Sequence, residues 1–125
     1  MDFLLDSHAL LWALGSPEKL SLPAARAIAD PNHAVYFSAV SVWELEIKRA
    51  RGKLTLPGDW SSGIEERGFL ELAVTSKHAT ASARLPWHHQ DPFDRMLIAQ
   101  AQIQGLRFVS RDRVAAAYGV SLLEA

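Results

Sequence analysis

The feature that most constrains the fold of this chain is an alternation of short apolar runs with longer helical patterns. The apolar runs have the length of strands that are buried on both faces, and they cover residues 3–5, 35–37, 70–74, 108–109 and 120–123. The stretches between them predict helices over residues 9–14, 23–29, 40–50, 64–67, 78–84, 92–104 and 113–117. We therefore expect an α/β fold with a mostly parallel five-stranded sheet, flanked by helices and connected by right-handed crossovers.

The length and composition indicate one globular domain over residues 1–125. Hydrophobic residues make up 49% of the sequence and charged residues 22%, which is not the composition of a disordered chain. No apolar run reaches the roughly 18 to 20 residues that a membrane span requires, and the sequence starts without the basic leader of a signal peptide. We expect a soluble, cytoplasmic protein that has no membrane partner.

The charge and the lack of cysteine limit the kind of site that the chain can form. Thirteen Lys and Arg residues nearly balance fourteen Asp and Glu residues, so any binding of nucleic acid must rest on a local surface. Because the chain has no cysteine, a bound metal must be held by carboxylates, imidazoles, carbonyls or water. Such ligands suit hard divalent ions.

Two aspartates stand directly beyond predicted strands. In a parallel sheet the ligand site lies outside the carboxyl ends of the strands, and Asp6 and Asp112 both occupy such positions. The same positions suit helix N-caps, because Asp and Ser accept hydrogen bonds from the first free backbone N–H groups. Taken singly, Asp6, Ser7 and Asp112 fit a capping role better than a catalytic one.

Asp94 stands out because it is in line with an apolar helix face. Leu97, Ile98 and Ala101 follow it at the spacing of one helical side. Asp91, which precedes a proline, has the form of the N-cap of this helix. An acid that only stabilises the helix dipole should point to water, so the position of Asp94 favours a functional role.

Glu44 is the acid that helical geometry places least well. It follows Ser41 by three residues, and the two side chains have the spacing of a capping box. If one apolar stripe faces the core, Glu44 and Glu46 flank it at similar angles, so periodicity does not choose between them. That stripe is predicted from Trp43, Ile47 and Ala50.

The four acids gain meaning from their expected convergence at one edge of the sheet. Four neighbouring carboxylates would repel one another and raise their own pKa values. One or two Mg²⁺ or Mn²⁺ ions would neutralise them. The residues thus predict a metal centre built from Asp6, Glu44, Asp94 and Asp112.

Three segments that span the chain resemble the PIN-domain ribonucleases, in particular the VapC-type toxins of toxin-antitoxin pairs. The segments are LLDSHALLWAL, FSAVSVWELEIKRARGKL and DPFDRMLIAQAQIQGLRFVSRD. The resemblance implies a twisted parallel five-stranded sheet between helices, and it assigns the family's four acids to Asp6, Glu44, Asp94 and Asp112. Asp6, Asp94 and Asp112 would be metal ligands, and Glu44 would complete the ligand set or hold a water molecule. Ser7 and Ser110 stand where the family often has threonine.

The resemblance also implies an activity and partners. The activity is metal-dependent hydrolysis of RNA that leaves a 5'-phosphate and a 3'-hydroxyl, on a structured target such as a tRNA loop. The expected partners are a small antitoxin protein and a second copy of the chain in a homodimer.

Several interpretations stay open in the sequence. The basic residues around the acids would either contact phosphates or pair with carboxylates; they are Lys48, Arg49, Arg51, Lys53, Arg95, Arg111 and Arg113. His88 and His89 lack the third imidazole of a typical zinc site, so the predicted site does not include them.

Two other functions compete with the ribonuclease. An aspartate after the first strand is also typical of enzymes that form a phosphoaspartate, although His8 stands where a haloacid-dehalogenase phosphatase has its second aspartate. The other alternative is a non-catalytic PIN-like module that binds RNA or docks a protein.

Overall fold

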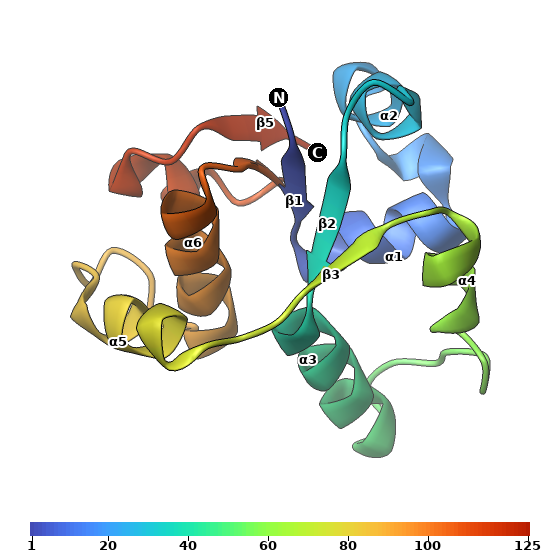
Figure 1. Cartoon of the computed structure of the whole chain (residues 1–125). Helices are drawn as coiled ribbons and strands as arrows, with labels where there is room; N and C mark the ends of the chain where they lie inside the picture. Colours follow the sequence, from blue (N-terminus) through green and yellow to red (C-terminus); the bar gives the residue numbers. More distant parts are fainter.

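The computed structural model describes all 125 residues and has one sheet with helices on both sides (Figure 1). The strands are β1 (Phe3–Leu5), β2 (Val35–Ser38), β3 (Leu70–Leu72), β4 (Arg107–Ser110) and β5 (Leu122–Glu124). The α-helices are α1 (Ser7–Gly15), α2 (Leu22–Ala29), α3 (Ala39–Ala50), α4 (Ser62–Glu66), α5 (Ser76–Arg84) and α6 (Pro92–Gln104). Two 3₁₀ helices, η1 (Pro17–Lys19) and η2 (Arg113–Tyr118), complete the chain. None of the helices is both long and apolar enough to cross a membrane.

All strand pairs in the sheet are parallel, in the order β3-β2-β1-β4-β5. The prediction of a parallel five-stranded sheet flanked by helices is therefore confirmed. The chain leaves β1 toward β2 and β3 on one side and later returns to place β4 on the other side. The direction of the crossovers thus reverses between β1 and β4, which is where open α/β sheets bind ligands.

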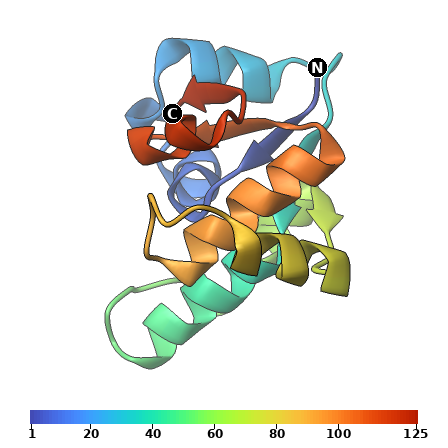
Figure 2. The same cartoon turned by 90° about the vertical axis from the view of Figure 1, so that its left-hand side faces the viewer.

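Alternate residues of the central strands are buried on opposite faces of the sheet. Leu4 of β1 and Phe108 of β4 pack in a cluster with Leu97 and Ile98 of α6. Leu5 and Val109 pack on the other face, in a cluster that includes buried side chains of α1 and α2. Figure 2 shows the face that α5 and α6 cover. Burial on both faces explains why the central strands read as continuous apolar runs.

The two edge strands differ from the sequence prediction. β3 ends at Leu72 rather than at residue 74, and Leu70 is 47% exposed. β5 covers Leu122–Glu124 rather than residues 120–123, and none of its three residues is fully buried. The expectation that every strand is buried on both faces is wrong here, because an edge strand has only one neighbouring strand and less helical cover.

The predicted buried stripe of α3 is also wrong. Trp43 is 61% exposed, whereas Val40, Ser41, Glu44 and Leu45 are the buried residues of this helix. The indole of Trp43 contacts Phe93 of α6 edge to face instead of entering the core. The side of α3 that packs inward is thus the one that carries Glu44, and this decides between the two glutamates left open by periodicity.

Candidate functional site

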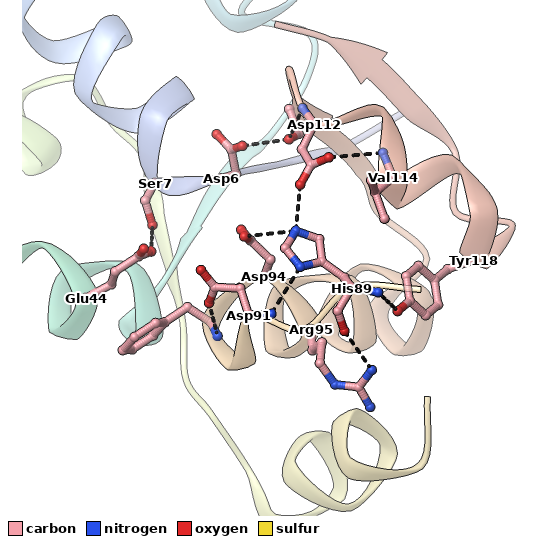
Figure 3. A network of polar contacts seen from close by, with 12 residues as sticks. Asp6, Ser7, Glu44, His89, Asp91, Asp94, Arg95, Asp112, Val114 and Tyr118 are labelled. Carbon is pink, nitrogen blue, oxygen red and sulfur yellow. Dashed lines mark hydrogen bonds and ion pairs between the residues drawn. The ribbon is translucent and has the colours of Figure 1, made fainter. Parts of the chain in front are cut away.

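The four predicted acids lie together at the carboxyl edge of the central strands (Figure 3). Asp6 directly follows β1, and Asp112 comes two residues after the end of β4. Glu44 and Asp94 lie on α3 and α6, whose first turns open onto the same edge. Because β1 and β4 are adjacent, this edge is also the point where the crossovers reverse.

Asp6 is buried and uses both of its oxygens in hydrogen bonds. Its Oδ1 accepts from the backbone N–H of Ala9 at 2.7 Å, as the N-cap of α1, and its Oδ2 accepts from Ser110 Oγ at 2.6 Å. Burial raises the pKa of this carboxyl above its ordinary value, although the bonds from Ser110 and Ala9 oppose that rise and Glu44 adds to it. The cap and the site therefore use the same carboxylate.

Glu44 does not form the predicted capping box with Ser41. Ser38 is the N-cap of α3, and the hydroxyl of Ser41 is buried without a hydrogen-bond partner. Glu44 instead accepts from Ser7 Oγ at 2.6 Å and from Lys48 Nζ at 3.0 Å. Ser7 of α1 thus fixes one carboxylate oxygen of Glu44, which α3 carries to the site.

Glu46, the other candidate on α3, lies away from the site. Its carboxylate accepts from the indole Nε1 of the buried Trp60 at 2.6 Å and pairs with Arg49 at 2.9 Å. This glutamate therefore anchors the segment that precedes α4.

The surroundings of Asp94 raise the pKa of its carboxyl strongly. Burial, followed by the charge of Asp91, raises its pKa to about 7, with smaller increases from Glu44 and Asp6. His89 partly opposes the rise. Since charges act over short distances in a protein, these effects indicate that Asp6, Glu44 and Asp94 share one electrostatic environment. The prediction that Asp91 caps α6 is confirmed, because its Oδ1 accepts from Phe93 N at 2.8 Å.

Asp112 also combines a cap with a place in the site. Its Oδ1 accepts from Val114 N at 3.0 Å at the start of η2. The backbone N–H of Asp112 donates to Ser110 Oγ at 3.0 Å, and the same hydroxyl donates to Asp6 Oδ2. Ser110 therefore links the acids that follow the two central strands.

His89 is a member of the cluster that the sequence prediction left out. Its Nε2 lies 2.6 Å from Asp112 Oδ2 and 3.2 Å from Asp94 Oδ2 (Figure 3). One donor atom each from His89, Asp94 and Asp112 fall within 4.8 Å of one another. The only signal in the sequence was the closeness of His88 and His89 to the DPFD segment, which does not tell which imidazole turns inward.

The donor chemistry of the cluster fits a hard divalent cation. Carboxylate oxygens are the ligands that Mg²⁺ and Mn²⁺ prefer, and the cluster concentrates acids whose charges raise the pKa of Asp94. A cation placed among them would relieve that repulsion. Asp94 Oδ1 takes part in no hydrogen bond or ion pair of the structure, which leaves it free for such a ligand.

The basic residues that accompany the acids have mostly structural contacts. Arg95 is 3% exposed and donates only to backbone carbonyls, so its guanidinium is not free for a phosphate. Arg111 donates to the carbonyls of Lys19 and Ala125, and Arg113 pairs with Glu124. Lys48 is the basic residue in contact with one of the four acids, through its ion pair with Glu44.

Comparisons with known proteins relate this chain to one protein family and to solved structures of similar fold. Residues 3–120 match the PIN domain family. The chain is 32% identical over 114 residues to Ribonuclease VapC22 of Mycobacterium tuberculosis, which covers 88% of this chain and 86% of that protein. Among solved structures, its fold is similar to a chain of VapBC2 from Rickettsia felis bound to a promoter DNA fragment, with a TM-score of 0.72, 12% identity and 98% coverage of both chains. It is also similar to a chain of DNA-bound VapBC from Salmonella typhimurium, with a TM-score of 0.70, 17% identity and coverage of 98% and 97%.

Proposed function

The chain belongs to the PIN domain family, and from this premise we propose that it is a metal-dependent endoribonuclease of the VapC type. The observation that carries the proposal is the convergence of Asp6, Glu44, Asp94 and Asp112 at the crossover reversal of a parallel sheet. The curated relative with the matching sequence is named as a ribonuclease. The substrate is therefore proposed to be RNA.

Asp6, Asp94 and Asp112 are proposed to hold a Mg²⁺ or Mn²⁺ ion. Such an ion supplies Lewis acidity that activates water and stabilises the charge of the leaving 3'-oxygen during in-line attack on a phosphodiester. The hydroxyl of Ser110 keeps Asp6 in place for this role, and Ser7 does the same for Glu44. Glu44 completes the ligand set or orients the attacking water. The products would carry a 5'-phosphate and a 3'-hydroxyl.

We further propose that the protein is the toxin of a toxin-antitoxin pair. The solved structures with a similar fold include VapBC complexes and a toxin-antitoxin complex from Klebsiella pneumoniae. A small antitoxin would then inhibit the nuclease in the cytoplasm, and the toxin would form a homodimer. The RNA target is proposed to be structured, such as a tRNA, because a loop exposes unstacked bases to a protein.

Cleavage assays on purified protein test the proposal. Total RNA or tRNA is incubated with Mg²⁺ or Mn²⁺, with and without EDTA, and the cleaved ends are mapped. We expect cleavage only with the cation, and we expect Asp6→Asn and Asp94→Asn to abolish it while the circular dichroism spectrum stays unchanged. Asparagine retains the capping ability of Asp6, so a loss of activity reports on the charge. Undiminished cleavage in either variant refutes the assigned site.

The alternative is a non-catalytic PIN-like module that binds RNA or docks a protein. It predicts RNA or antitoxin binding without cleavage under any metal condition, and equal binding by the wild type and by Asp94→Asn. The buried acids favour the nuclease, because a docking module gains nothing from a raised carboxyl pKa next to Asp6 and Glu44.

A further inference from the structure

Every polar group of His89 has a partner in the structure. Its backbone N–H donates to Tyr118 Oη at 2.8 Å, and its carbonyl accepts from Arg95 Nη1 at 3.2 Å. In the ring, Nδ1 accepts from the backbone N–H of Asp91 at 3.1 Å. The other ring nitrogen, Nε2, faces Asp112 and Asp94. A histidine fixed at four points is a built part of the site rather than a mobile side chain.

The hydrogen bond from Asp91 settles which ring nitrogen carries the proton. A backbone N–H can only donate, so Nδ1 of His89 must present its lone pair to Asp91. The proton of the neutral ring is then on Nε2, which donates it to Asp112 Oδ2 at 2.6 Å, with Asp94 Oδ2 at 3.2 Å. A nitrogen that carries a proton has no lone pair to give a metal ion. Of the three grouped residues His89, Asp94 and Asp112, only the two aspartates can therefore act as metal ligands.

We propose that His89 is a positioning residue, which donates its Nε2 proton to Asp112 Oδ2, lies 3.2 Å from Asp94 Oδ2, and so orients these two carboxylates toward a shared cation. This inference rests on the proposed function, since it presumes that the two aspartates are the ligands. His89 itself does not bind the metal. The site is therefore an oxygen-donor site, and its selectivity is that of Mg²⁺ or Mn²⁺ rather than that of zinc.

The surroundings of His89 keep the imidazole at this place. Arg95 donates to the carbonyls of Ser82, Leu85, Pro86 and His89, so one buried guanidinium ties the end of α5 to the segment that leads to the site. Tyr118 Oη donates to Pro86 O at 2.7 Å while it accepts from His89 N. Movement of the imidazole away from the acids would break the contacts that hold Pro86 and His89 in place. The Nε2–H donor of His89 is therefore in position before any metal binds, as is usual for the hydrogen-bond partners of metal ligands.

A pair of variants separates the donor from the bulk of the side chain. His89→Leu fills the volume without a polar group, and His89→Gln places an amide N–H near the position of Nε2. Both variants lose the acceptor for Asp91 N, so their difference reports on the donor alone. His88→Ala is the matched control, because this neighbouring histidine is exposed and contacts Tyr118 rather than the acids.

Binding of Mn²⁺ is measured by EPR titration on the full chain, without RNA. Loss of a partner that orients a metal ligand lowers affinity by about 10-fold to 100-fold, and we expect a fall of this size in His89→Leu. His89→Gln and His88→Ala should stay close to the wild type. Pulsed EPR of the Mn²⁺-loaded wild type should show no nitrogen coupling of the size that a directly bound imidazole gives.

Three results overturn the inference, and they differ from a failure of the proposed function. An unchanged affinity in His89→Leu, an affinity of His89→Gln as low as that of His89→Leu, or directly bound nitrogen in the wild type each rejects a positioning role. If the wild type binds Mn²⁺ and cleaves RNA, any of these results removes this inference alone. A wild type that neither binds the ion nor cleaves RNA overturns both.

If His89→Leu does not fold, Tyr118→Phe replaces it, and unchanged Mn²⁺ affinity in that variant counts against the inference.

Discussion

The raised pKa of Asp94 predicts that this acid destabilises the metal-free protein at neutral pH. In the unfolded chain the carboxyl ionises near its ordinary value of 3.8, whereas in the folded chain it ionises at about 7. Below pH 3.8 the group is protonated in both states and has no effect. As the pH rises toward 7, the unfolded state loses its proton first, so folding stability falls over this range and the full penalty is present above it.

The size of the penalty follows from the two pKa values of Asp94. They differ by about 3 units, and one unit corresponds to about 1.36 kcal/mol, which gives an upper limit of about 4 kcal/mol. The side chain is 29% exposed, so solvent screening reduces this value. We expect Asp94→Asn to stabilise the metal-free protein by about 1 to 3 kcal/mol at pH 7.5 and by less than half of that at pH 5.

Urea unfolding in EDTA at the two pH values measures this gain in Asp94→Asn. Glu65→Gln is the control, because Glu65 is an exposed first-turn acid of α4 and reports the loss of a favourable helix-dipole interaction alone. Added Mn²⁺ should reduce the stability advantage of the variant, since a ligand at 100 times its Kd stabilises the wild type by about 2.7 kcal/mol and the variant by less. A variant that is no more stable than the wild type at pH 7.5, or a gain that does not shrink at pH 5, refutes this electrostatic reasoning.

Two further predictions concern side chains that hold the site together. Ser110→Ala removes the hydroxyl between Asp6 and the backbone of Asp112. We expect the Mn²⁺ affinity measured by calorimetry to fall about 10-fold in this variant, whereas Ser110→Thr should stay close to the wild type. An equal affinity in Ser110→Ala and the wild type would contradict the linking role. Arg95→Ala leaves buried carbonyls without their donor, so urea unfolding should show a loss of about 3 kcal/mol or more. A loss under about 1 kcal/mol would mean that water replaces the guanidinium.

The fold could be predicted from the sequence because burial on both faces leaves a strong local signal. The central strand β1 carries an apolar residue at every position, as Leu4 and Leu5 illustrate, and no neighbouring element has to be known to recognise it. The face of α6 could be predicted for the same reason, since Leu97 and Ile98 are completely buried and Asp94 lies in line with them at the site. The edge strands carry a weaker signal because only part of their surface is covered.

Other parts of the site depend on contacts between segments that are distant in sequence. Helical periodicity shows that Trp43 and Glu44 lie on different sides of α3, but the packing of α3 against α1 and α6 decides which side turns inward. In the same way, His89 reaches Asp112 because Arg95 and Tyr118 hold its backbone. No pattern within residues 85–91 encodes these partners.

The sequence also posed capping and metal binding as alternatives, and the structure shows that a carboxylate has room for more than one contact. Asp6 and Asp112 each accept a bond from a helix N-terminus with Oδ1, while Oδ2 faces Ser110 or His89. An oxygen that accepts one hydrogen bond still has a second lone pair. The cap fixes the orientation of the acid, so a helix start supports the site rather than competing with it.

The pairing of β1 with β4 joins two segments that are far apart in the sequence, and this has a consequence for synthesis of the chain. The hydroxyl that secures Asp6 belongs to Ser110, 104 residues later in the chain. While β4 and Asp112 are still inside the ribosome, a growing chain cannot assemble the cluster of four acids, even if its first helices have already folded. The proposed nuclease site would therefore form only after Ser110 and Asp112 have been synthesised.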